Sequence, residues 1–163
     1  MGADEPAPPN SIYSADSSAL IHAWRRAYRP KNFGFIWERV EELISVGRLF
    51  VSVEVFKEIE RKDDDLHAWC KDRGDGFCVQ IDDAIQLHLR RIMENYPKLV
   101  DLAKGRSAAD PFVIALAATS HPRMVVVSEE NPGKVRIPDV CNAEGIECIR
   151  VADLIEREDW HFG

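Results

Sequence analysis

The sequence predicts a three-layer α/β/α sandwich with a central parallel sheet. Short apolar segments alternate along the chain with longer amphipathic ones, which is the order of strands and helices in α/β proteins. The short segments, such as LFVS and MVVVS, are continuous apolar runs, and such runs are typical of strands buried on both faces of a parallel sheet. No internal repeat of fixed period is visible, so solenoids and propellers are excluded.

The first strand and helix are expected directly after a polar N-terminal segment. A strand over residues 11–15 precedes a helix over residues 17–28. The apolar residues of this helix recur at helical spacing and therefore share one face: Leu20, Ile21, Trp24 and Tyr28. Pro30 is expected to end the helix, because the residue before a proline is biased away from the helical conformation.

A helix, a strand and a third helix follow. Residues 35–46 have the apolar spacing of an amphipathic helix, and the apolar run at residues 49–52 predicts the next strand. Ser52 is placed to cap a helix over residues 53–61, since its hydroxyl can accept a hydrogen bond from a free N–H of the first turn.

The middle of the chain, residues 63–101, is polar and amphipathic and carries no recognisable catalytic motif. Residues 63–73 have the pattern of a helix, and the GDG segment that follows breaks it. A longer helix is expected to begin near Asp82.

After Gly105 the chain becomes strongly apolar. Residues 107–120 predict an Ala-rich helix, and residues 124–128 predict a buried strand bounded by polar turns. A short helix is expected over residues 137–145. The segment 145–159 predicts the last strand and helix.

Length and composition limit the domain organisation and the location of the protein. The 163 residues suit one domain, expected over residues 11–163. Residues 1–10 are Pro-rich, polar and acidic, which predicts a disordered tail. The sequence has no apolar run long enough to span a bilayer, and its start lacks the basic and hydrophobic parts of a signal peptide. A cytoplasmic protein without a membrane partner is therefore expected.

Charge and residue types disfavour several classes of site. The net charge of −7 argues against nucleic-acid binding over a generally positive surface. Local groups of Lys and Arg are equally compatible with phosphate contacts and with solvated helix faces. Four cysteines without CxxC spacing and five histidines without HExxH or paired spacing disfavour a zinc site. Carboxylates remain as the candidate functional groups.

Four acidic positions, far apart in the sequence, each stand where a strand ends or a helix begins. They are Asp16, Glu58, Asp110 and the Glu129/Glu130 pair. In an open α/β sheet, residues at the carboxyl ends of different strands meet in one crevice. Carboxylates gathered there repel one another, so a hard divalent cation such as Mg²⁺ or Mn²⁺ is expected to neutralise them.

Each acid also has a purely structural interpretation. Asp16 fits the N-cap of the first helix, and Asp110 follows Ser107 at the spacing of a capping box. The other acids fit an exposed helix position or a polar turn. The combination favours a functional site, because all the positions are expected at one end of the sheet. Small side chains would let the Ala-rich helix approach the strands and bring Asp110 close to them.

At these positions the chain resembles the PIN domain nucleases over about residues 11–155. The motifs of that family are an Asp ending the first strand, a Glu in an early helix, an Asp opening a later helix and an acid after the following strand. The same order is found here in YSADSSALI, VEVFKEIER, SAADPFVIALA and VVVSEEN. The resemblance implies that the catalytic and metal-binding residues are Asp16, Glu58, Asp110 and Glu130.

The fourth motif departs from the family pattern of Thr, a polar residue and Asp. Ser128, Glu129 and Glu130 stand there instead. Glu130 takes the position of the Asp, and Ser128 matches the family's hydroxyl. Glu129, Asn142 and Asp139 are candidates for additional polar contacts around the metal.

The resemblance implies a Mg²⁺- or Mn²⁺-dependent ribonuclease that hydrolyses RNA phosphodiester bonds. Within the family, the chain is most similar to small bacterial PIN-like proteins with an IPDVC-type segment after the fourth strand, which resemble the toxins of toxin–antitoxin pairs. An RNA substrate, an antitoxin protein as partner and a homodimer follow from this resemblance.

Two other kinds of function compete with the nuclease. A catalytically degenerate PIN-like binding or assembly module is raised by the Glu at the fourth position and by the acidic surface. An aspartyl-phosphate enzyme or a receiver domain would also place an Asp after the first strand. The aspartyl-phosphate enzyme is disfavoured because Ser18 stands where it needs a second Asp. The receiver domain is disfavoured because the chain lacks the paired acids and the partner Lys expected there.

Overall fold

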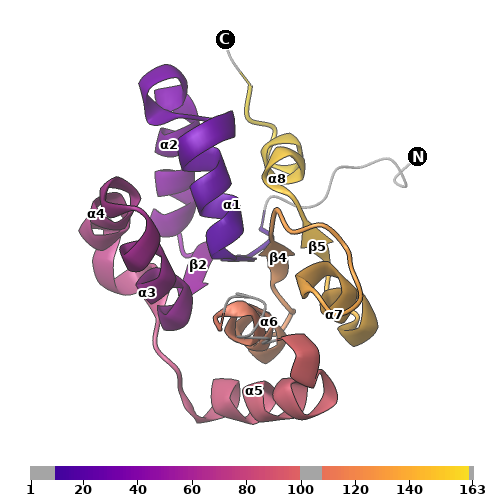
Figure 1. The fold of residues 1–163 in the computed structure, drawn as a ribbon. Coiled ribbons are helices and arrows are strands. Elements are labelled where there is room, and N and C mark those ends of the chain that lie inside the picture. The colour runs from indigo at the N-terminus through magenta and orange to yellow at the C-terminus, as the bar shows by residue number, and fades with distance from the viewer. Residues whose placement is uncertain (1–9, 100–107, 162–163) are drawn as a thin grey trace.

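The described part of the chain forms a parallel sheet between two layers of helices. The computed structural model describes residues 10–99 and 108–161 (Figure 1). Within these residues the strand order is β3-β2-β1-β4-β5, and every neighbouring pair is parallel. The strands are β1 (Tyr13–Ala15), β2 (Leu49–Ser52), β3 (Cys78–Val79), β4 (Val125–Val127) and β5 (Cys148–Ile149). The predicted three-layer α/β/α sandwich is confirmed.

Helices cover both faces of this sheet. In chain order they are α1 (Ser17–His22), the π-helical segment η2 (Ala23–Ala27), α2 (Pro30–Ser45), α3 (Val53–Lys62), α4 (Asp64–Arg73), the 3₁₀ segment η3 (Gly74–Gly76), α5 (Asp83–Asn95), the 3₁₀ segment η4 (Pro97–Leu99), α6 (Asp110–Thr119), α7 (Ile137–Glu144) and α8 (Val151–Arg157). Figure 1 shows α1, α2 and α8 over one face, whereas α6 lies on the other and is backed by α5.

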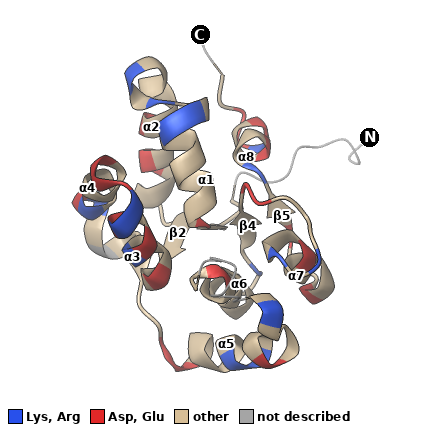
Figure 2. Ribbon diagram, viewed as in Figure 1, with Lys and Arg blue, Asp and Glu red and all other residues tan. Residues whose placement is uncertain are grey.

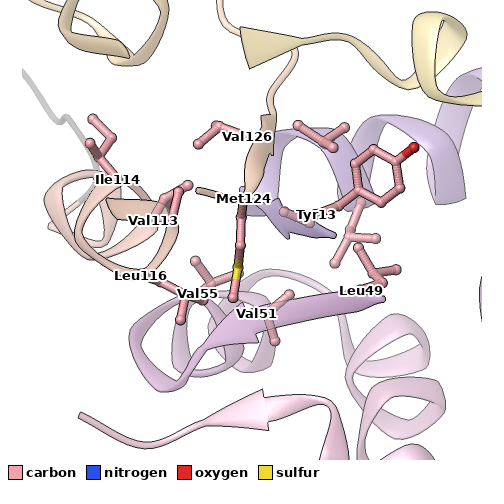
Figure 3. Packing of buried hydrophobic residues seen from close by; sticks show 14 of the residues in the cluster. Tyr13, Leu49, Val51, Val55, Val113, Ile114, Leu116, Met124 and Val126 are labelled. Atoms are coloured by element: carbon pink, nitrogen blue, oxygen red, sulfur yellow. The ribbon is translucent and has the colours of Figure 1, made fainter. Parts of the chain in front are cut away.

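Part of the hydrophobic core lies where α6 packs against the central strands. Figure 3 shows Val113 and Ile114 of α6 close to Val126 of β4, with Val51 of β2 nearby. The hydroxyl of Ser14 in β1 donates a hydrogen bond to the Val113 carbonyl at 3.0 Å. Almost all of α6 is buried between the sheet and α5, which explains why this helix is apolar on every face.

The start of α3 agrees with its predicted cap. The Ser52 hydroxyl accepts a hydrogen bond from the Glu54 N–H at 3.3 Å, and α3 begins at Val53. Since Ser52 also ends β2, the cap leaves no loop between this strand and the helix that follows. The position of every residue on α3 is therefore set directly by the sheet.

Two local predictions were wrong. The second helix, predicted to start at residue 35, begins earlier, at Pro30, the first residue of α2. Proline tolerates this position because its missing N–H would have no partner there. Sequence reasoning also missed β3, an edge strand of two residues that pairs with β2 through Cys78 and Val79. A strand this short carries too few residues for an apolar run to stand out from the polar segment around it.

Some predictions concern residues outside the described part of the chain. The disordered tail predicted for residues 1–10 falls there except for Asn10, as does the helix start at Ser107. The described helix begins at Asp110. The extent of a single domain over residues 11–163 stays a prediction. Across the described ranges, no helix combines the length and apolarity needed to span a membrane.

Candidate metal centre

Asp16 and Ser128 lie side by side at the carboxyl ends of the central strands. Ala15, the last residue of β1, is in register with Val127, the last residue of β4, and the Asp16 N–H donates to the Val127 carbonyl at 2.9 Å. The chain adds β2 and β3 on one side of β1, and β4 and β5 on the other. Open α/β sheets bind their ligands at such a point of reversal.

The Asp16 carboxylate is buried and faces hydroxyl groups. Although Asp16 is the N-cap residue of α1, its side chain makes no capping hydrogen bond. Its Oδ2 accepts hydrogen bonds from Ser18 Oγ at 2.6 Å and from Ser128 Oγ at 3.1 Å. Its Oδ1 is buried and has no hydrogen-bond partner among the described residues. Helix capping therefore does not account for this side chain.

Asp110 reaches the same place from α6. It is the first residue of that helix, and only 2% of it is exposed. Buried alanines on α6, such as Ala115 and Ala117, let the helix lie close to β1 and β4. As in Asp16, the Oδ1 atom is buried and, within the described ranges, without a hydrogen-bond partner.

Glu130 completes a cluster of three carboxylates. One carboxylate oxygen from each of Asp16, Asp110 and Glu130 lies within 4.8 Å of the other two, and we call these residues the carboxylate cluster. Glu130 stands in the turn after β4, where its N–H donates to Ser128 Oγ at 3.2 Å and its Oε1 accepts from the Ile137 N–H at 3.3 Å. Figure 2 shows acidic segments at the start of α6 and in the turn after β4, at one end of the sheet.

Glu58 lies beside the carboxylate cluster but outside it. The structure buries this residue on α3 with 3% exposure, although its place at the edge of the apolar face also suited an exposed position. The Ser17 hydroxyl donates a hydrogen bond to Glu58 Oε1, and Lys62 Nζ lies 3.9 Å from Glu58 Oε2. The negative charge of Glu58 still raises the pKa values of both Asp16 and Asp110, so it acts on the same site.

Most of the residues predicted to make additional polar contacts around the metal lie or bind away from the carboxylate cluster. Glu129 accepts a hydrogen bond from the Val151 N–H at 2.8 Å and lies 3.4 Å from Arg150 Nη1, at the start of α8. Asp139 accepts from two backbone N–H groups near the start of α7, those of Gly133 and Arg136. Asn142 is exposed toward the C-terminal end of α7. Of the predicted additional contacts, that of Ser128 lies at the cluster itself.

Burial and mutual repulsion raise the pKa values of the buried carboxyls. Burial is the largest cause for Asp16, where the charge of Glu130 adds to it and the hydrogen bond from Ser18 opposes it. Burial is also the largest cause for Asp110, followed by the charges of Asp16 and Glu130. A hydrogen bond between the Asp110 and Glu130 side chains favours protonated Asp110. Asp16 and Asp110 therefore bind protons unusually tightly when no cation neutralises their charges.

These residues fit a hard divalent cation. The donor set is entirely carboxylate oxygen, which suits Mg²⁺ or Mn²⁺ rather than zinc or copper. Two of the oxygens, Oδ1 of Asp16 and Oδ1 of Asp110, are buried without a partner in the described part of the chain, so both can accept a ligand bond without losing a hydrogen bond.

Sequence reasoning missed two hydroxyl groups of the site. Ser17 binds Glu58, and Ser18 binds Asp16 while also accepting a hydrogen bond from the Glu129 N–H at 3.0 Å. These serines connect α1 to α3 and to the turn after β4. The available signal was their position directly after Asp16, since hydroxyls in the first turn of a helix can reach neighbouring carboxylates.

Comparison with known proteins places the chain in a family and supports its fold. The family described as "Domain of unknown function (DUF4411)" matches residues 13–162. No curated protein gives a significant match. The 2.2 Å resolution structure of VapBC-1 from nontypeable Haemophilus influenzae contains a similar chain, with 18% sequence identity and a TM-score of 0.53. The match covers 84% of this chain and 96% of that chain. At this identity the likeness concerns the fold, which is PIN-like.

Proposed function

The chain belongs to the family described as Domain of unknown function (DUF4411), and we propose that it is a metal-dependent ribonuclease that hydrolyses RNA phosphodiester bonds. The observation that carries the proposal is the carboxylate cluster of buried Asp16, buried Asp110 and half-buried Glu130, in which two oxygens have no hydrogen-bond partner among the described residues. The cluster lies at the carboxyl end of the sheet, where open α/β sheets bind their ligands. The PIN-like fold supports the same activity.

In this proposal each acid has a defined role. Asp16, Asp110 and Glu130 bind Mg²⁺ or Mn²⁺ directly, and Glu58 adds negative charge from α3 while Ser17 fixes its carboxylate. A bound cation would lower the pKa of a water molecule and neutralise charge on the phosphate. The hydroxyls of Ser18 and Ser128 hold Asp16 Oδ2, whereas Oδ1 has no hydrogen-bond partner among the described residues.

The biological setting proposed is a toxin–antitoxin pair. The chain would then be the toxin, act in the cytoplasm, and bind an antitoxin protein that blocks the carboxylate cluster. A homodimer that places two clusters along one groove is part of the same proposal. The similarity of fold to a chain of VapBC-1 supports this setting.

Replacing single carboxylates tests the activity. Asp16→Asn and Asp110→Asn keep the side-chain volume but remove the charge. Each should lower Mn²⁺-dependent cleavage of single-stranded RNA by about 100-fold or more, since even partners outside the ligand set change metal sites by about 10–100-fold. Asp65→Asn, at an exposed position in the first turn of α4, is the matched control and should cleave like wild type. Unchanged cleavage by Asp16→Asn would rule out the proposed site.

A binding module without catalysis is the second candidate. It is favoured by one observation, the Glu at position 130 where the PIN pattern has Asp, because the longer side chain changes how the fourth acid meets a cation. Such a module would bind Mn²⁺ at the cluster but leave RNA intact. Cleavage that depends on both Mn²⁺ and Asp16 would exclude it.

A further inference from the structure

The turn that contains Glu130 is held by hydrogen bonds from Arg150, the residue before α8. We call residues 128–131 the β4 turn. Arg150, the residue before α8, donates from Nη2 to Asn131 Oδ1 at 2.6 Å and from Nη1 to the Glu129 carbonyl at 3.2 Å. The same Nη1 lies 3.4 Å from Glu129 Oε1. One guanidinium group thus binds the residues on both sides of Glu130.

Glu129, which belongs to this turn, makes a second contact with the start of α8. Its Oε2 accepts a hydrogen bond from the Val151 N–H at 2.8 Å, and its Oε1 lies 3.8 Å from His22 Nε2 on α1. On the inner side of the turn, the Glu129 N–H donates to Ser18 Oγ at 3.0 Å. The β4 turn is therefore held by hydrogen bonds to Ser18 of α1 and to Arg150 and Val151 at the start of α8.

We propose that Arg150, together with Glu129, is a positioning residue that holds the Glu130 carboxylate in the metal-binding cluster. This inference rests on the proposed function, because it assumes that Glu130 binds the cation. Glu has one more rotatable bond than Asp, so fixing its carboxylate requires more order in the backbone that carries it. The forked contacts of Arg150 supply that order, and Lys could not reproduce them because it lacks the planar fork.

The sign of the effect separates positioning from simple electrostatics. Arg150 is a positive charge near the cluster, and its removal would by charge alone strengthen the binding of a cation. If Arg150 positions Glu130, its removal must instead weaken cation binding. The two explanations therefore predict opposite changes in affinity for the same variant.

The test measures Mn²⁺ affinity by titration calorimetry in a double-mutant cycle. Arg150→Ala should raise the Kd for Mn²⁺ about tenfold, as expected for a residue that orients a metal ligand. Glu130→Gln should also raise it, and the double variant should bind like Glu130→Gln alone, since Arg150 acts through Glu130. Arg157→Ala is the matched control, because it removes another arginine of α8 whose partner is Glu147, outside the β4 turn. Its Kd should equal that of wild type.

The inference would be overturned if Arg150→Ala bound Mn²⁺ as tightly as wild type or more tightly. It would also be overturned if the effects of Arg150→Ala and Glu130→Gln on the Kd were fully additive. These results would leave the proposed function intact. Absence of Mn²⁺ binding by wild-type protein would instead contradict the proposed function itself. If Arg150→Ala does not fold, Asn131→Ala provides the second variant, because it removes only the 2.6 Å contact from an exposed turn residue. That variant should weaken Mn²⁺ binding in the same direction, and unchanged affinity would also contradict the inference.

Discussion

At the scale of single residues, the distinctive feature is a pair of aspartates with a buried oxygen that accepts no hydrogen bond within the described ranges. These are Oδ1 of Asp16 and Oδ1 of Asp110. Leaving a buried acceptor unpaired costs about 1–3 kcal/mol of folding free energy, and more when the group is charged. Protonation or a bound cation relieves this cost. Both routes make the stability of the protein depend on solution conditions.

The raised pKa values predict how stability changes with pH in the absence of metal. Burial raises the pKa from about 3.8 to about 6 in Asp16, and to about 9 in Asp110. At these two carboxyls the folded protein binds more protons than the unfolded protein from about pH 3.8 up to the folded pKa values, so their contribution to stability is lost as pH rises through the folded pKa values. Asp63 and Glu144 have lowered pKa values, and their contributions are lost only toward acidic pH.

We expect the free energy of unfolding, measured with denaturant and a chelator, to decrease from about pH 5 to about pH 8. Asp110→Asn, which cannot ionise, should reduce the slope. Asp65→Asn is again the control and should keep the wild-type slope. A flat pH profile in wild type, or a slope that Asp110→Asn leaves unchanged, would contradict this account.

Some residues of the candidate site could be predicted from the sequence and others could not, depending on where each lies in the fold. Asp16 and Glu130 follow apolar strands, so their convergence could be predicted from the rule for parallel sheets. The burial of Glu58 could not be settled, because the helical pattern puts it at the edge of the apolar face. Its burial depends on the packing of α3 against other elements, among them α1 and α6, which local patterns do not reveal. Ser17 and Ser18 were missed because they act through hydrogen bonds between elements, which spacing alone does not reveal.

At the scale of elements, helix starts determine where the acids point. Asp110 opens α6, and Glu58 lies in the second turn of α3, whose start is fixed by Ser52 at the end of β2. The helix patterns and the Ser52 cap were readable in the sequence, whereas the two-residue β3 was too short to detect. A shift of α3 by one residue would rotate Glu58 by about 100° away from Ser17.

Removing the cap of α3 tests this dependence on helix starts. Ser52→Ala eliminates the acceptor for the Glu54 N–H and should lower the free energy of unfolding by about 1 kcal/mol in denaturant unfolding. Ser45→Ala is the control. Its exposed hydroxyl donates to the Glu42 carbonyl at the end of α2, and its loss should change stability by less than about 0.5 kcal/mol. Equal stabilities for Ser52→Ala and wild type would show that the cap does not fix α3.

At the scale of the whole molecule, the strand order brings distant segments together. The sequence predicted a parallel sandwich, but the order β3-β2-β1-β4-β5 follows from which strands pair, and pairing is a long-range property that local patterns do not encode. This order places β1 next to β4 and lays α6 across both. The three acids of the carboxylate cluster therefore come from three different elements of the fold.

A cation bound by the carboxylate cluster should therefore stabilise the whole fold. At free Mn²⁺ near 100 times its Kd, binding to the folded state alone contributes about 2.7 kcal/mol. For a chain of this size, that corresponds to a rise in Tm of roughly 5–10 °C in thermal unfolding. Asp16→Asn should abolish most of the rise, whereas Asp65→Asn should keep it. A rise of equal size in Asp16→Asn would mean that Mn²⁺ binds elsewhere, because that variant removes one carboxylate of the cluster but leaves the acids on the surface unchanged.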